Sequence, residues 1–386
     1  MRQQRGRHLH HGHAAPQDRR VGAFDRLESA WPVHGSILVL DNVAYCAAGR
    51  STYLDGGIAL YGLDIPSGRI RYRTRLAGPH RATGERNLGF FSPGANSDIL
   101  TAEGGYIYMR QLKLTPELQE VPVPVLSNKG AQDVGMHIFS TASMLDDSWY
   151  NRTYWMYSRR WPGFQLGNQA PKSGQLLVVD DERTYAVRAF YRRNVHSPMF
   201  FPGKEGYLLF ADKNTTEPQV YGEAGSSEPV AWLPQSEYSR GKKDGKSGDE
   251  RWIPLDQQAY EYDKGVGYTR TEAPVWKTFL PIRIKAMVKT RDTLFVAGPP
   301  DVLDSADPYA AFEGRRGAYL SALSATDGRE MTRIELSSPP VFDGMIAAHG
   351  RLFVSLRDGR IVCLQGSKTT GMDINPEPLS EVARAL

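Results

Sequence analysis

The sequence has little cysteine and no long apolar run. Only Cys46 and Cys363 occur among 386 residues, so no disulfide framework and no cysteine-based zinc site can form. A helix needs about 18 or more consecutive apolar residues to cross a bilayer, and no such run is present. The first residues are basic but lack the apolar segment of a secretory signal. The sequence therefore predicts neither a membrane-spanning helix nor a signal peptide in this chain.

A surplus of charge is also missing from the body of the chain. The 47 Lys and Arg residues against 43 Asp and Glu residues give a formal net charge of +4. Five of the arginines and only one acid lie in residues 1–20, so the remainder holds equal numbers of basic and acidic residues. Proteins that hold nucleic acid by charge present a basic face, and here only the head is basic. Nucleic acid is therefore not expected as a partner.

Motifs of common enzyme classes are absent as well. The sequence contains no Gly-x-Ser-x-Gly, His-Glu-x-x-His or Gly-x-Gly-x-x-Gly. Residues 241–247 resemble a phosphate-binding loop, but only three residues separate the two glycines, and no strand precedes them. Asp180 and Asp181 stand between two strand-like runs, which predicts a hairpin turn and not a pair of catalytic carboxylates. We predict no catalytic residue and no metal ligand.

The chain does contain an internal repeat of four short strands separated by turns. Residues 37–76 show this order first, residues 286–336 repeat it, and residues 345–364 give a third, partial copy. Repeats of about 40 to 50 residues with four strands each are typical of a β-propeller, whose blades bury their faces against one another. We predict an all-β fold, a β-propeller of four-stranded blades, about five to eight in number and possibly incomplete.

The same pattern predicts the domain limits. The propeller is expected over residues 27–366, with a polar loop between blades at 236–251. A basic, His- and Arg-rich disordered head is expected over 1–26, and a tail over 367–386.

The repeat unit from Leu63 to Tyr72, Leu-Asp-x-x-Ser-Gly-Arg-x-x-Tyr, resembles the blade signature of propellers named after pyrroloquinoline quinone enzymes. Segments 27–76, 145–160 and 339–364 are more closely similar to bacterial quinone-binding-like β-propeller repeat proteins, which are abundant in planctomycetes. The resemblance implies the propeller fold and that this chain is the C-terminal part of a longer ancestor. For such an ancestor it also implies export, and hence a periplasmic or other extracytoplasmic location.

The chain departs from the quinone enzymes at two points. Their blades carry a docking tryptophan where this sequence has Tyr72 and Thr332, and their cofactor rests on adjacent cysteines, whereas Cys46 and Cys363 lie in different repeats. Pyrroloquinoline quinone and calcium are thus suggested by the family name only, and we expect no cofactor. We predict a non-catalytic binding or scaffold propeller. The alternatives are a quinone- and calcium-dependent oxidoreductase of alcohols or sugars, and a truncated fragment without function.

The best candidate for a ligand surface is the aromatic and arginine-rich segment 149–164. Aromatic rings beside arginines can stack on sugars, bases or a flat cofactor, but the same rings also serve to pack one blade on the next. The loop 49–57 is the second candidate. The candidate ligand-binding residues are Trp149, Tyr150, Arg152, Tyr154, Trp155, Tyr157, Arg159, Arg160, Trp161, Arg50, Tyr53 and Asp55. The expected partner is an unidentified small molecule, glycan or protein, and the expected state is a monomer.

Overall fold

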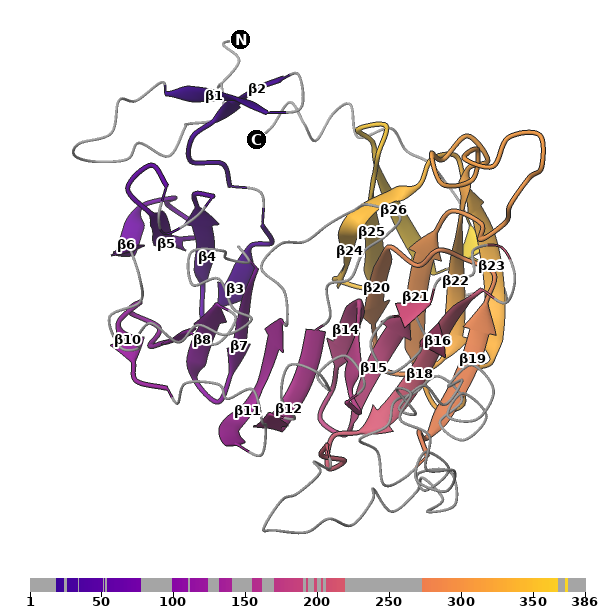
Figure 1. Ribbon diagram of the computed structural model, residues 1–386, viewed down its shortest axis with the longest axis horizontal. Coiled ribbons are helices and arrows are strands. Elements are labelled where there is room, and N and C mark those ends of the chain that lie inside the picture. The colour runs from indigo at the N-terminus through magenta and orange to yellow at the C-terminus, as the bar shows by residue number, and fades with distance from the viewer. Residues whose placement is uncertain are drawn as a thin grey trace, which may run out of the picture. The chain divides into compact units, whose positions relative to one another are not determined.

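The computed structural model describes residues 19–23, 26–33, 35–50, 52, 54–77, 99–109, 112–123, 132–140, 155–161, 170–189, 192–193, 198–199, 203, 206–218, 273–366 and 372–373. Within these ranges all regular structure consists of β-strands, most of them in four-stranded antiparallel sheets (Figure 1). The predicted all-β fold of four-stranded blades is confirmed. None of the described residues forms a helix that could cross a bilayer.

The chain divides into two compact units. Unit 1 comprises Met1–Asp146 and Arg152–Gly167, and unit 2 comprises Asp147–Asn151 and Asn168–Leu386.

Unit 1 contains two four-stranded sheets and two antiparallel strand pairs. In both sheets, strands that follow one another in the chain are neighbours, with the orders β3-β4-β5-β6 and β7-β8-β9-β10. The pairs are β1 with β2 and β11 with β12. The bounds are β1 (Arg20–Ala23), β2 (Arg26–Ser29), β3 (Leu38–Leu40), β4 (Val43–Ala48), β5 (Ile58–Asp64), β6 (Ile70–Leu76), β7 (Leu100–Glu103), β8 (Tyr106–Met109), β9 (Leu112–Leu114), β10 (Glu120–Val121), β11 (Gln132–Ser140) and β12 (Trp155–Trp161).

Unit 2 contains three further four-stranded sheets, with the orders β14-β15-β18-β19, β20-β21-β22-β23 and β24-β25-β26-β27, and the short pair β16 and β17. The bounds are β13 (Ser173–Gly174), β14 (Leu176–Val179), β15 (Arg183–Arg188), β16 (Arg192–Arg193), β17 (Pro198–Met199), β18 (Tyr207–Lys213), β19 (Trp276–Leu280), β20 (Ala286–Lys289), β21 (Thr293–Gly298), β22 (Ala318–Ser324), β23 (Glu330–Leu336), β24 (Pro340–Ala348), β25 (Arg351–Leu356), β26 (Ile361–Gly366) and β27 (Met372–Asp373). Strand β1 of unit 1 lies within the predicted head, 1–26, and strand β27 of unit 2 lies within the predicted tail, 367–386.

The sheets β3–β6 and β20–β23 are two copies of one unit. Ile58 pairs with Leu76 in the first, as Ala318 pairs with Leu336 in the second, and both sheets have an irregularity at the same place, after Gly62 and after Ala322. Gly57 and Gly317 have positive φ and lie so close to the carbonyl oxygens of Leu76 and Leu336 that a Cβ atom would collide with them. The predicted repeat between residues 37–76 and 286–336 is therefore a repeat in structure.

Consecutive sheets share their apolar cores, as propeller blades do. In unit 1 one core joins side chains of β3–β6 with those of β7–β10. In unit 2 one core joins β14-β15-β18-β19 with β20–β23, and another joins β20–β23 with β24–β26. The first strand of each sheet contacts the first strand of the next, as in β14 with β20 and β20 with β24.

A docking tryptophan is present in unit 2, at a place where the sequence pattern did not indicate it. Trp276 lies on β19, the fourth strand of its sheet, and pairs with Ala211 of β18. In the next sheet Thr332 has the equivalent position, paired with Ala322. Its indole Nε1–H donates to the carbonyl oxygen of Ala325 at 3.0 Å, and its ring covers Gly328 so tightly that a Cβ there would collide with it. Trp276 thus fastens its sheet to β20–β23.

The structure also shows the turn at Asp180 and the two cysteines. Asp180 accepts hydrogen bonds from the backbone N–H groups of Glu182 and Arg183 between β14 and β15, which confirms the predicted hairpin turn. Cys46 is buried and Cys363 is half-buried, and both are free thiols. Residues 236–251 and 241–247 lie outside the described residues.

Candidate functional site

The first predicted ligand segment is described only in part. Trp149, Tyr150, Arg152 and Tyr154 lie outside the described residues. The remaining candidates are on β12, where the rings of Trp155, Tyr157 and Trp161 are buried, Arg160 is half-buried and Arg159 is exposed.

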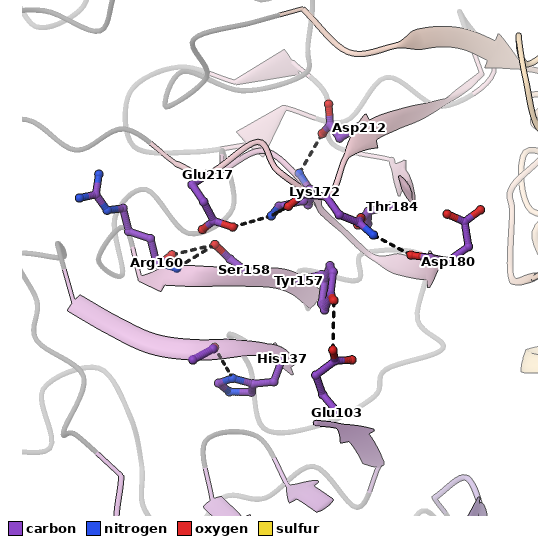
Figure 2. A network of polar contacts seen from close by, with 12 residues as sticks. Glu103, His137, Tyr157, Ser158, Arg160, Lys172, Asp180, Thr184, Asp212 and Glu217 are labelled. Atoms are coloured by element: carbon purple, nitrogen blue, oxygen red, sulfur yellow. Dashed lines mark hydrogen bonds and ion pairs between the residues drawn. The ribbon is translucent and has the colours of Figure 1, made fainter. Parts of the chain in front are cut away.

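One buried ring of β12, Tyr157, contacts the neighbouring sheet of unit 1, as does His137 of β11. The Tyr157 hydroxyl donates to Glu103 Oε1 at 3.4 Å (Figure 2). The His137 ring stacks on Tyr108 at 4.3 Å between centroids. Burial lowers the pKa of His137 to about 4, so its ring is neutral at pH 7. Tyr157 thus takes part in packing against the neighbouring sheet, and a ligand role for segment 149–164 stays a prediction.

The second predicted site is the β4–β5 loop, residues 49–57, and it is organised around one carboxylate. Arg50 forms an ion pair with Asp55 Oδ2, and Arg19 Nη1 lies 3.1 Å from the other oxygen, Oδ1. The Trp31 indole donates to the Asp55 carbonyl oxygen at 2.9 Å. The Asp55 side chain is only 6% exposed, while those of Arg50 and Arg19 are 31% and 52% exposed. Tyr53 lies outside the described residues.

The equivalent connection in the other copy is the β21–β22 loop, residues 299–317, which is roughly twice as long. At its start Asp301 Oδ1 accepts from Arg283 Nε at 3.1 Å, with side chains 0% and 4% exposed. Asp301 Oδ2 accepts from the backbone N–H of Gly203 at 3.1 Å. Burial raises the pKa of Asp301 above its ordinary value, against the opposing effects of Arg283 and of the Gly203 hydrogen bond.

The rest of the β21–β22 loop is held by its own ion pairs and by an aromatic ring. Arg315 pairs with Asp307 and Glu313, and Arg316 pairs with Asp304. The guanidinium of Arg283 and the ammonium of Lys285 both lie over the Phe312 ring, at 5.4 Å and 5.8 Å from its centroid.

Large apolar side chains are nevertheless exposed on this loop. Val302 is 38% exposed, and Leu303 and Tyr309 are each 57% exposed. We did not predict these residues as a site from the sequence. The sequence feature that could have indicated this site is the length of the β21–β22 loop. The repeat aligns the strands on both sides of it with β4 and β5, so its extra length relative to the β4–β5 loop can be seen in the sequence.

A third polar cluster, in unit 2, is structural. Lys172 is fully buried, and its Nζ donates to Glu217 Oε1 at 2.7 Å and to the Asn214 carbonyl oxygen at 2.8 Å (Figure 2). Burial lowers the pKa of Lys172, and Glu217 opposes that shift. Arg188 is buried beside it and donates to the carbonyl oxygens of Ala170 and Ser173. Each of these charges is used to hold chain segments together.

The described residues do not bring together three His, Cys, Asp or Glu side chains as a metal site requires.

No protein-family model matches the chain, and no curated protein matches it. Several solved structures are similar over most of its length. BamB from Moraxella catarrhalis is 9% identical, with 88% of this chain and 84% of that chain covered and a TM-score of 0.35. A europium-containing methanol dehydrogenase is 10% identical, with 88% and 77% covered and a TM-score of 0.33. The quinohemoprotein alcohol dehydrogenase from Comamonas testosteroni is 12% identical, with 90% and 43% covered and a TM-score of 0.30. At these scores the likenesses assign neither a family nor an activity.

Proposed function

We propose that this protein is a non-catalytic binding protein built from propeller blades, and that its β21–β22 loop contacts a protein partner. The observation that carries the proposal is the exposure of Val302, Leu303 and Tyr309 on a loop whose base is fixed by the buried Arg283–Asp301 pair.

An apolar centre with a charged rim is the usual anatomy of a protein interface. Here the apolar side chains are flanked in the same loop by the ion-paired Asp304, Asp307, Arg315 and Arg316. Because the buried Arg283–Asp301 pair and these ion pairs restrain the loop, docking of a partner would lose less conformational entropy than with an unrestrained loop. Exposed leucine and tyrosine on a fixed loop therefore favour recognition of a partner by shape.

The buried charges at the base of the loop support a binding role. Asp301 is held by Arg283 and by the backbone N–H of Gly203, so the Arg283–Asp301 pair serves to fix the base of the loop. Segment 149–164 remains in the proposal as a second contact surface, through its exposed members such as Arg159.

The test uses a photo-crosslinking amino acid at position 309, with the same substitution at Ile361 as control. Ile361 is 50% exposed on β26 and lies outside the loop. In cells of the source organism, we expect one specific crosslinked protein from position 309 and none from position 361. That protein, once purified, should bind the unmodified chain and lose about tenfold or more in affinity when Leu303 and Tyr309 are both changed to Ser.

Two results would contradict the proposal. One is an affinity for that protein that is unchanged by the Leu303→Ser/Tyr309→Ser variant. The other is dye-linked oxidation of alcohols or sugars after addition of pyrroloquinoline quinone and calcium, because this would support the oxidoreductase alternative.

A further inference from the structure

We propose that the β4–β5 loop end of the sheet β3–β6 is a binding site for a phosphoryl group, formed by the guanidinium groups of Arg19, Arg50 and Arg75. This site lies in unit 1 and is independent of the protein contact proposed for the β21–β22 loop in unit 2.

Asp55 positions two of the three arginines. Each of its carboxylate oxygens faces one guanidinium, Oδ2 that of Arg50 and Oδ1 that of Arg19. The backbone of Asp55 has a φ of 54°, and its carbonyl oxygen accepts the hydrogen bond from Trp31. Trp31 is itself buried in the core between the β1–β2 pair and β4–β5. The carboxylate is thus fixed from within the unit and holds both arginines at one spot.

The third guanidinium comes from the edge strand β6. Arg75 pairs with Ala59 across β5 and β6, and its Nη1 and Nη2 atoms lie 3.4 Å and 3.8 Å from the point where a Cβ of Gly56 would be. Gly56 directly follows Asp55 and has a φ of 80°. The Arg75 guanidinium therefore lies beside the residue that directly follows Asp55, whose carboxylate pairs with Arg19 and Arg50.

The cluster has charge and donors to spare. Asp55 and Gly56 have three arginines beside them and one carboxylate between them, and within the described part of the chain no ion pair joins Arg75 to an acid. The Nε–H of Arg50 is buried and has no hydrogen-bond partner among the described residues. An unpaired buried donor is unfavourable, and an anion bound beside Arg50 would satisfy it.

A phosphoryl group fits the cluster better than other anions. It carries about −1.5 to −2 charges at pH 7 and offers three strong acceptor oxygens, which matches a surplus of two positive charges and three guanidinium forks. A carboxylate offers one charge and two oxygens and would leave part of the surplus in place. Arginine is also the side chain that pairs with phosphate through two parallel hydrogen bonds.

The second copy of the sheet shows that the repeat does not require this surplus. There Glu335 occupies the position of Arg75, opposite Tyr319 as Arg75 is opposite Ala59. The carboxylate of its loop, Asp301, has a single arginine partner, Arg283, in the ion pairs of the described residues. The repeated sheet therefore does not impose the excess of arginine at the β4–β5 loop.

The test measures binding to the whole chain by isothermal titration calorimetry at 0.15 M salt, with inorganic phosphate and with methyl phosphate as the two probes. We expect saturable binding with one site. Arg75→Glu and Arg50→Gln should each weaken it about tenfold or more, by loss of a charge-assisted contact. Arg71→Glu is the matched control, because Arg71 is exposed on the same strand and the change in net charge is that of Arg75→Glu. It should change the affinity less than about twofold, since exposed charges are screened at this salt concentration.

The probes separate two sources of the phosphoryl group. Equal affinities would mean that the site recognises the phosphoryl group alone, as free phosphate presents it. A higher affinity for methyl phosphate would assign the site to phosphate esters. Equal weakening by Arg75→Glu and Arg71→Glu, or binding that does not saturate, would overturn the proposal. Because Arg50→Gln could disturb the loop, the decisive comparison is between Arg75→Glu and Arg71→Glu, both at exposed strand positions, with unfolding midpoints measured alongside.

Discussion

The β4–β5 loop and the β21–β22 loop occupy the same place in two copies of one sheet and use arginine and aspartate in opposite ways. In the first, one aspartate that is nearly buried faces arginines that remain in contact with solvent. In the second, one aspartate and one arginine are both buried and balance each other. The strands around the two loops have the same register. The sheet therefore determines where a loop begins and ends, and the loop determines what its charges do.

The length of the loops gives the physical reason for the difference. The longer β21–β22 loop can fold over its own base, so Phe312 covers Arg283 and Lys285, and the backbone of Gly203 closes the remaining oxygen of Asp301. A buried charge must be paired, which fixes its partners one to one. The short β4–β5 loop leaves its arginines at the surface, where water tolerates a surplus of charge.

The largest predicted effect is the loss of the buried pair. Asp301→Ala leaves the Arg283 guanidinium buried without its partner, and such a change costs about 3–5 kcal/mol. Asp55→Ala should cost only about 1 kcal/mol, because the side chains of Arg19 and Arg50 are 52% and 31% exposed and their charges are partly solvated. Urea unfolding monitored by tryptophan fluorescence measures both. Equal losses for the two variants would remove the contrast between the loops.

A double variant serves as the control for this prediction. Arg283→Met with Asp301→Leu replaces the pair by apolar side chains of similar size and should recover most of the stability that Asp301→Ala loses. If the double variant is as unstable as the single one, packing around the site and not the unpaired charge explains the loss.

The second prediction concerns what fastens the sheet β20–β23. Trp276→Ala removes the ring that covers Gly328 and the hydrogen bond to Ala325, and should lower the free energy of unfolding by about 3–5 kcal/mol. The equivalent residue of the sheet β3–β6 is Tyr72, which is half-buried, and Tyr72→Ala should cost clearly less. Thermal unfolding of both variants gives the comparison, and a larger loss for Tyr72→Ala would contradict it.

The third prediction is that unit 1 loses stability in acid through His137. The pKa of this buried ring is about 4 in the folded protein, below its ordinary value of 6.5. As the pH falls through 6.5 the unfolded chain binds a proton that the folded chain cannot bind, so the loss is confined to the window from 6.5 to 4. Its slope is at most about 1.4 kcal/mol per pH unit. Urea unfolding at pH 7 and pH 5 measures it.

The control for this pH effect is His137→Phe, which keeps a ring against Tyr108 but has no proton to bind. It should show a smaller loss between pH 7 and pH 5 than the unchanged protein. A variant that loses as much stability would assign the acid effect to other groups.

Much of the fold could be predicted from the sequence because strands and turns leave local patterns. The repeat between residues 37–76 and 286–336 shows in the alternation of apolar runs with turns such as Pro66-Ser67-Gly68 and Asp327-Gly328. Trp276 escaped prediction, because the partner of its strand is β18, and β18 ends at Lys213, far away in the sequence.

The candidate sites were harder to predict because they depend on contacts between distant residues. Arg50 and Asp55 were predicted from one loop, but Arg19 and Arg75 reach it from other elements. Similarly, Asp301 and Arg283 lie 18 residues apart and meet only when the β21–β22 loop folds. The body of the chain is balanced in charge as a whole. Its composition therefore cannot show that Arg19 and Arg75, from other elements, lie beside a loop that contains Arg50 and Asp55.

The smallest predicted effect is the most specific to the comparison. Glu335→Arg places in the second copy the arginine that the first has at position 75, on an exposed strand position. It should change the unfolding free energy by less than about 0.5 kcal/mol. It should also create no phosphate binding in a protein that carries Arg75→Glu, since Arg283 remains buried and paired with Asp301 and cannot turn toward the new arginine. Calorimetry with inorganic phosphate on the double variant Arg75→Glu/Glu335→Arg measures this. Recovered binding there would mean that an arginine on the fourth strand suffices, and that the Asp55 cluster is not what makes the site.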